Sequence, residues 1–232
     1  MKPIDIQEIR SLALFSKMAD INFETLIRGA YIQNFPPQIE LITEDEPCDF
    51  LHIVVEGSVE LFSRWNGRET AMATVRPIST FILAAAIKDS PYLMSARTNE
   101  KSRIILLPSK DVRAVFDIDN TFARSVVNEL AQCYRSVVKT TKNLKLRTSI
   151  ERLANYFLRQ YTFAGNAVEF ELKMEKRLLA SYLGMTPENL SRAIKALQPY
   201  GVHVNGSRVT ISNLADLIAF AKPTASIDDP SY

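Results

Sequence analysis

The sequence predicts an α+β protein made of an N-terminal β-barrel of the jelly-roll type, a long dimerisation helix and a C-terminal winged helix-turn-helix. Three observations support this prediction. Short apolar segments separated by turn residues fill the first half of the chain, a long stretch with helical spacing follows, and two short helices around a glycine turn precede a hairpin. Strands do not alternate with helices, which argues against a parallel-sheet nucleotide-binding fold.

The composition indicates a globular protein with a substantial core. Hydrophobic residues make up 47% of the 232 positions and charged residues 23%, which is ordinary for a folded protein. No uncharged run exceeds twelve residues, whereas a membrane span needs about 20, and the N-terminus lacks the apolar stretch of a secretion signal. With two cysteines in all, we expect a cytoplasmic protein of a reducing compartment that has no membrane partner.

Charge is unevenly divided between the two halves of the chain. Residues 1–119 hold 13 Lys and Arg against 17 Asp and Glu, while residues 120–232 hold 15 against 9. A basic C-terminal half favours contact of that half with a polyanion, although a difference of this size also arises by chance.

The first half of the chain carries the signals of a small β-sandwich or β-barrel, which we assign to residues 1–110. Two short helices are expected within residues 5–30. Strands are expected at 38–44, 50–56, 58–63, 70–75 and 102–108. Asn66-Gly67 is the strongest turn signal, because it supplies two residues that tolerate positive φ for a type I′ hairpin.

Residues 111–147 are predicted to form the dimerisation helix. Apolar or small residues recur at alternating spacings of 3 and 4 from Ala123 to Leu144, which is a heptad seam that favours a partner helix. We therefore expect a homodimer whose contacts include Val126, Leu130, Cys133, Val137 and Leu144. The alternative is a helix packed on its own domain, for which Val127, Tyr134 and Val138 widen the apolar stripe.

A second helix start follows directly. Thr148 and Glu151 form a capping-box pattern, and apolar residues from Ile150 to Tyr161 mark a new helix, so residues 145–149 are the expected hinge. The last domain is assigned to residues 148–222. Residues 223–232 lack a burial pattern and are expected to be a flexible tail.

Residues 175–197 carry the pattern of a helix-turn-helix. Leu178 to Leu183 predict a short helix, Gly184 supplies the turn, and Thr186 is an N-cap with Pro187 in the first helical turn. The second helix has an apolar face of Leu190, Ala193, Ile194 and Leu197, and a polar face of Glu188, Ser191, Arg192 and Lys195. In such motifs the second helix enters the major groove of DNA. The alternative is a surface helix with ordinary solvated charges.

The polar face suits the reading of bases. The Arg192 guanidinium can pair with guanine O6 and N7, Glu188 can accept from a cytosine amino group, and Ser191 can meet a thymine or adenine edge. A hairpin turning at Asn205-Gly206 is expected to form a wing that holds a phosphate. The DNA-binding candidates are therefore Thr186, Glu188, Ser191, Arg192, Lys195, Ser207 and Arg208.

The stretches Asp49–Phe62 and Leu183–Arg192, with the long helix between them, resemble the cyclic-AMP receptor protein/FNR family of bacterial transcription regulators over nearly the whole chain. The resemblance implies an effector barrel of the cyclic-nucleotide-binding type, with RNA polymerase as a further partner. The Glu-x-x-Ser-Arg motif at 188–192 is similar to that of the FNR branch, which implies a palindromic DNA site with TTGAT-like half-sites. Pro187 stands where the cyclic-AMP receptor branch carries an arginine.

The barrel lacks the phosphate cassette that cyclic-nucleotide binders of this family carry. Leu83-Ala84 replaces the expected Gly-Glu, and Tyr92-Leu93-Met94 stands where Arg-Ser is expected, while Arg97 suits the next strand better. A cyclic phosphate would be left unpaired among apolar groups, which costs several kcal/mol. We therefore expect no cyclic-AMP binding.

The residues narrow the choice of cofactor but leave more than one possibility. The cysteine cluster of FNR is absent, and Cys48 and Cys133 have no metal-site spacing, so we expect no iron–sulfur cluster and no metal site. Haem is the remaining family option, with His52 either an iron ligand or, more commonly, a packed core residue. An apolar group either lines a pocket for haem or another hydrophobic effector, or fills the cavity itself. That group is Phe81, Ile82, Leu83, Leu93 and Met94.

The expected function is that of a dimeric DNA-binding regulator whose barrel senses a signal other than a cyclic nucleotide and shifts the population of hinge conformations. An effector-independent regulator with a vestigial barrel is the alternative. A metal-dependent, cupin-like enzyme is disfavoured, because the barrel has one histidine and no nucleophile–base pattern. We accordingly expect no catalytic residues.

Overall fold

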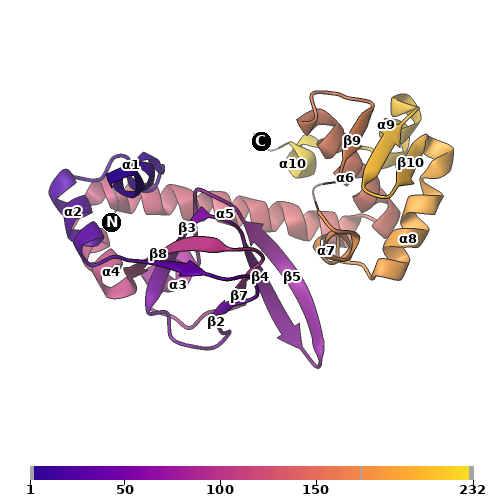
Figure 1. Ribbon diagram of the computed structural model, residues 1–232. Helices are drawn as coiled ribbons and strands as arrows, with labels where there is room; N and C mark the ends of the chain where they lie inside the picture. Colours follow the sequence, from indigo (N-terminus) through magenta and orange to yellow (C-terminus); the bar gives the residue numbers. More distant parts are fainter. Residues whose placement is uncertain (1–2, 173, 230–232) are drawn as a thin grey trace. The chain divides into compact units, whose positions relative to one another are not determined.

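The computed structural model describes residues 3–172 and 174–229 and divides the chain into two compact units, Met1–Cys133 and Tyr134–Tyr232. Helix α5 (Asn120–Leu146) begins in the first unit and ends in the second. Figure 1 shows long strands gathered in the first unit, and helices with a small sheet in the second.

The N-terminal unit is built on two antiparallel sheets. Their strand orders are β1-β8-β3-β6 and β2-β7-β4-β5. The strands are β1 (Tyr31–Phe35), β2 (Glu40–Ile42), β3 (Phe50–Glu56), β4 (Val59–Trp65), β5 (Arg68–Val75), β6 (Ser79–Phe81), β7 (Ser95–Thr98) and β8 (Ser102–Pro108). The helices are α1 (Pro3–Ser11), α2 (Asp20–Arg28), α3 (Leu83–Lys88) and α4 (Ser109–Ile118). The predicted α+β class with an N-terminal β domain is confirmed.

One hydrophobic core joins the two sheets to the helices. Ile53 of β3, Ile104 of β8 and Val59 of β4 are all fully buried in it. Phe122 of α5 stacks on Phe15, with ring centroids 5.9 Å apart. The first turns of α5 are therefore part of the core of this unit.

The hairpin between β4 and β5 follows the prediction. Trp65 pairs with Arg68, and the turn residues Asn66 and Gly67 have φ values of 48° and 71°, as a type I′ turn requires. Trp65 stands at the end of β4 with 83% of its surface exposed. Strands β1 and β6, which lie at the two edges of one sheet, were not predicted.

The helical region over 111–147 is not one helix, which differs from the prediction. Asp119 separates α4 from α5 with φ −107° and ψ 96°. Its carboxylate accepts hydrogen bonds from the backbone N–H groups of Thr121 and Phe122, each at 3.0 Å. A side chain that caps the second helix in this way also ends the first one.

The C-terminal unit consists of helices and a small three-stranded sheet. Its helices are α6 (Ser149–Phe163), α7 (Lys176–Tyr182), α8 (Pro187–Ala196), the 3₁₀ helix η1 (Gln198–Tyr200), α9 (Leu214–Ala221) and α10 (Ala225–Asp228). Strands β9 (Glu169–Glu171), β10 (Val202–Asn205) and β11 (Arg208–Ile211) pair in the order β10-β11-β9. Among residues 3–172 and 174–229, no helix combines the length and apolar character needed to cross a membrane.

Two local expectations for this unit have different outcomes. The capping box at the start of α6 is present, with Thr148 and Glu151 bonded reciprocally. The expected flexible tail, by contrast, contains α10, and Asp228 within it is hydrogen-bonded to Arg147. The tail prediction missed this contact because its partner lies 81 residues away in the sequence.

Candidate nucleic-acid interface

Helices α7 and α8 are joined by a tight turn at Gly184. Hydrogen bonds from the N–H of Gly184 to the carbonyl of Ser181 and from Met185 to Ala180, both 2.9 Å, close the end of α7. Gly184 has a φ of +63°, and a Cβ there would lie 2.8 Å from Cδ2 of Leu144, at the end of α5. The positive φ favours glycine at this position.

The start of α8 and its buried face follow the prediction. The Oγ1 of Thr186 accepts a hydrogen bond from the N–H of Asn189 at 3.2 Å, and Pro187 occupies the first turn. The buried face consists of Leu190, Ala193 and Leu197. Since these residues pack into the core of the C-terminal unit, the opposite face of α8 is directed to solvent.

Every residue predicted to contact DNA is exposed. These residues are Thr186, Glu188, Ser191, Arg192 and Lys195 at α8, and Ser207 and Arg208 at the hairpin between β10 and β11. The backbone N–H of Glu188 and the hydroxyl of Thr186 lower the pKa of the Glu188 carboxyl. The exposed face of α8 and its cap therefore offer one carboxylate, two hydroxyls and two cations.

A residue that the sequence analysis did not single out holds the Arg192 side chain. The Nη2 of Arg192 donates a hydrogen bond to Oδ1 of Asn189 at 2.8 Å. The hydroxyl of Ser191 donates to the carbonyl of Pro187 at 3.0 Å, within the same helix. The spacing of three residues between Asn189 and Arg192 is the signal that could have identified this pair.

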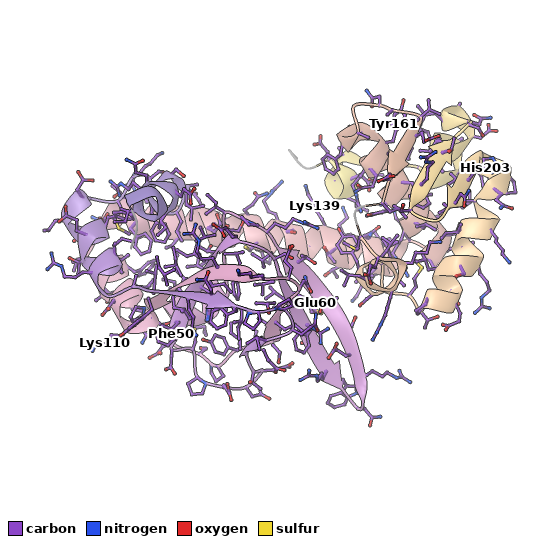
Figure 2. The ribbon with its side chains drawn as sticks, in the orientation of Figure 1. Phe50, Glu60, Lys110, Lys139, Tyr161 and His203 are labelled. Carbon is purple, nitrogen blue, oxygen red and sulfur yellow. The ribbon has the colours of Figure 1, made fainter. Side chains whose placement is uncertain are left out.

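The wing is present, and its turn lies one residue later than expected. Asn205 pairs directly with Arg208, so the turn residues are Gly206 and Ser207 rather than Asn205-Gly206. Gly206 takes the positive φ, 61°, which suits glycine at the first position of a two-residue turn. The Nε of Arg208 lies 3.2 Å from Oε1 of Glu169, and both side chains are more than half exposed. Figure 2 labels His203 on the neighbouring strand β10.

A short helix, a glycine turn, a capped helix with an exposed polar face and a β-hairpin define a winged helix-turn-helix of the kind found in DNA-binding proteins. Two family models match the chain: the cyclic nucleotide-binding domain over residues 32–119 and the Crp-like helix-turn-helix domain over residues 151–220. The chain belongs to the Crp/Fnr family of transcription regulators. Members of this family bind DNA as dimers and are not enzymes.

The chain is also similar to individual proteins and solved structures. The anaerobic regulatory protein of Pasteurella multocida is 24% identical over 196 residues, which cover 79% of this chain and 69% of that protein. The structure of FixK2 from Bradyrhizobium japonicum has a TM-score of 0.67 at 24% identity, covering 84% of this chain and 99% of that chain. The c-di-GMP responsive global regulator CLP of Xanthomonas campestris has a TM-score of 0.66 at 15% identity, covering 83% and 99%. The two solved structures share the fold of this chain.

The residues predicted to line an effector pocket do not form one group. Phe81 and Leu83 are buried, and Ile82 and Met94 pack against the same core. Leu93 is 80% exposed, because the loop before β7 turns its side chain outward. Leu93 therefore has to be removed from the predicted pocket. A cavity of about 440 Å³ lies instead in the C-terminal unit, lined by residues of α6, α9 and the segment 223–229.

His52 is a packed core residue. It is 3% exposed in β3, and its ring stacks on Phe81 with centroids 5.0 Å apart. Burial lowers the pKa of His52 to about 4, although the nearby backbone of Phe50 acts in the opposite direction. Nδ1 has no hydrogen-bond partner. A ring enclosed in this way does not fit the role of a haem ligand unless the residues around it repack.

The guanidinium of Arg97 is paired with two carboxylates. It lies in β7, as its spacing indicated, and bonds to Glu60 at 2.8 Å and to Glu69 at 2.7 Å. Its guanidinium also lies 4.4 Å from the centroid of the Phe62 ring. Among the described residues, no three His, Cys, Asp or Glu side chains gather as a metal site.

The predicted dimer seam is divided between the core and the surface. Val126 is fully buried in its own unit, and Leu130 packs against the same core. Val126 is therefore unavailable to a partner helix, which corrects its assignment to the seam. Cys133 is exposed, as is Val137 at 62% and Leu144 at 44%. The large apolar residues of α5 that are exposed are Val127, Tyr134, Val137, Val138, Leu144 and Leu146.

Proposed function

We propose that the chain binds, as a homodimer, to palindromic DNA with TTGAT-like half-sites, and regulates transcription with RNA polymerase as a partner. The observation that carries this proposal is the exposed polar face of α8 over a buried apolar face. We assign effector sensing to residues 1–110, dimerisation to 111–147 and DNA binding to 148–222.

Base reading is assigned to residues 188–192 of α8. Arg192 pairs with guanine, Glu188 accepts from a cytosine amino group and Ser191 contacts a neighbouring base, each good pair contributing about 1–3 kcal/mol of discrimination. Phosphate contacts are assigned to Thr186, Lys195, Ser207 and Arg208. These contacts set the position of the protein on the duplex without reading the sequence.

Dimerisation is assigned to the exposed side of α5. Val137 and Leu144 keep the heptad spacing that a partner helix requires, in register with the partly buried Leu130, and the exposed residues Val127 and Tyr134 extend the same face. A two-fold dimer presents two copies of α8 to half-sites about 34 Å apart, one turn of the duplex.

We assign to the barrel a response to a signal other than a cyclic nucleotide. Leu83-Ala84 supplies no carboxylate for a ribose hydroxyl, and the guanidinium of Arg97 is occupied by Glu60 and Glu69. The other residues of the predicted group, Phe81, Ile82, Leu83 and Met94, are apolar, which suits a hydrophobic effector better than a charged one. A second candidate is an effector-independent regulator, favoured by the burial of Phe81 and Leu83 in the core.

The proposal is tested by titrating labelled duplexes, one carrying two TTGAT-like half-sites and one of random sequence. Arg192→Ala should weaken binding to the symmetric duplex by about 1–3 kcal/mol and relax preference at one base, while Arg208→Ala weakens binding to both duplexes alike. Equal losses on both duplexes for Arg192→Ala would contradict the assigned role.

The effector is tested on the same duplexes. Added cyclic AMP is expected to leave affinity unchanged. The visible absorption spectrum of protein purified from its own cell shows whether haem is bound. If no added effector changes the affinity of the protein for the symmetric duplex, the effector-independent candidate is supported.

A further inference from the structure

The C-terminal segment of the chain is bonded to the end of α5. Asp228 in α10 accepts two hydrogen bonds from the guanidinium of Arg147, at 2.8 and 2.6 Å. Both side chains are largely buried, at 8% exposed for Arg147 and 11% for Asp228. Two-point pairing between an arginine and a carboxylate fixes orientation as well as distance.

Two lysines of α5 add contacts on the same side. The Nζ of Lys139 donates to the carbonyl of Asp229 at 2.7 Å, and the Nζ of Lys142 donates to the hydroxyl of Ser226 at 2.7 Å. Figure 2 labels Lys139 on α5. The segment 226–229 is thereby attached to the last turns of α5 at several points.

A second arginine connects this junction to the helix-turn-helix. Arg152 of α6 is 9% exposed. Its Nη1 donates to the carbonyl of Arg147 at 2.7 Å, its Nε to the carbonyl of Leu183 at 2.8 Å, and its Nη2 to that of Gly184 at 3.2 Å. Each acceptor lies just beyond the end of α5 or α7, where helix carbonyls carry partial negative charge. A buried cation is stable only when its donors are satisfied, so these carbonyls are held together around Arg152.

We infer that Asp228, Arg147 and Arg152 form a junction clamp that positions the helix-turn-helix for DNA binding. Arg147 is shared, since its side chain binds Asp228 and its carbonyl accepts from Arg152. The clamp fixes the turn at Gly184 with respect to the end of α5, and the Gly184–Leu144 contact lies at the same place. Asp228 lies beyond the matched Crp-like helix-turn-helix region, which ends at residue 220.

The physical benefit is preorganisation. This inference rests on the proposed function, in which two copies of α8 must reach two half-sites at a set spacing. Ordering a loose junction at the moment of binding would cost affinity, and a junction that is already ordered avoids this cost. Asp228 is thus a positioning residue, which acts on DNA through Arg147 and Arg152.

The test compares Asp228→Asn, Arg147→Gln and the double variant with Asp117→Asn. Asp117 is an exposed residue of α4, and its substitution changes the net charge by the same amount as Asp228→Asn does. Relative to this control, each clamp variant should bind the symmetric TTGAT-like duplex about 3- to 30-fold more weakly, with little change on a random duplex. The double variant should lose no more than the weaker-binding single variant, because both substitutions break one linked network.

Amide hydrogen exchange without DNA provides the independent measurement. Exchange in Asp228→Asn should rise at residues 145–149 and 183–186, as well as in 223–229. A rise confined to 223–229, or strictly additive losses of affinity, would overturn the clamp. If the wild type does not distinguish the two duplexes, the proposed function fails, and exchange at 183–186 still decides the clamp on its own.

Discussion

The carboxylate of Asp119 accepts a hydrogen bond from the backbone N–H of Ala19 at 2.9 Å, across 100 residues of sequence. The same oxygen accepts from the amide of Asn22 at 2.9 Å. The other oxygen caps α5 by accepting from the N–H groups of Thr121 and Phe122. One side chain therefore ends α4, begins α5 and holds the loop before α2 against both.

Asp119→Ala should destabilise the N-terminal unit by about 1–3 kcal/mol, since it leaves several buried donors unpaired. Burial opposes the ionised form of Asp119, but the hydrogen bonds from Asn22, Thr121, Phe122 and Ala19 outweigh it and hold its pKa well below the usual range. This stabilisation is complete above about pH 4, the ordinary aspartate pKa, and is lost as the pH falls further. Urea unfolding followed by circular dichroism at pH 7 and pH 3 measures it.

The exposed neighbour Asp117 supplies the control for this experiment. Asp117→Ala should change the free energy of unfolding by less than about 0.5 kcal/mol. If the difference in the free energy of unfolding between Asp119→Ala and the wild type grows below pH 4, the assigned direction of the pKa shift is wrong.

His52 should make the N-terminal unit lose stability between pH 6.5 and pH 4. The unfolded chain takes up a proton near pH 6.5, whereas burial lowers the pKa in the folded unit to about 4, so acid favours the unfolded state in this interval. The loss is at most about 3 kcal/mol. His52→Leu should flatten the dependence of the free energy of unfolding on pH over this interval. His203→Leu, on the exposed wing, should preserve that dependence. Unfolding curves at half-unit pH steps distinguish the two outcomes.

Asn189→Ala should reduce base discrimination less than Arg192→Ala does. It removes the 2.8 Å hydrogen bond that holds the guanidinium, and a hydrogen bond of this kind is worth about 0.5–1.5 kcal/mol. The double variant should be no worse than Arg192→Ala alone. Titrations against duplexes that vary one base at a time measure the effect, with Gln198→Ala as the control. Additive losses would show that Asn189 contacts DNA independently.

Val137→Asp should separate the protomers, while Val126→Ala should not. Val137 is 62% exposed on α5, whereas Val126 is fully buried in the N-terminal unit. Val126→Ala removes two methyl groups from a core and should cost about 2 kcal/mol of stability. Sedimentation velocity gives the oligomeric state, and thermal unfolding gives the stability. A dimer that survives Val137→Asp would exclude this face of α5 as the interface.

Features that depend on neighbouring residues could be predicted from the sequence. The Asn66-Gly67 turn, the Thr148–Glu151 capping box and the Thr186 cap each need only a few adjacent residues, and all are present. The alternating apolar and polar faces of α8 were equally readable, because a helix places residues on its two faces at a regular period.

Features that depend on distant residues could not be predicted. The break at Asp119 requires a partner near Ala19, and the burial of Val126 requires the N-terminal core. The order of residues 225–228 depends on Arg147, 81 positions before Asp228. Periodicity shows that a helix face is apolar, but it does not show whether that face meets its own domain or a second copy of the chain.

The exposed hairpin tip has an optical consequence. The chain contains one tryptophan, and Trp65 holds that position beside the β4–β5 turn with 83% of its surface in water. The fluorescence maximum of its indole should therefore be red-shifted in the native protein, and iodide should quench it easily. The emission should change little when the distant core unfolds. Intrinsic fluorescence of this protein consequently senses whatever touches the hairpin, and a blue shift on mixing would mark a partner docked at that tip.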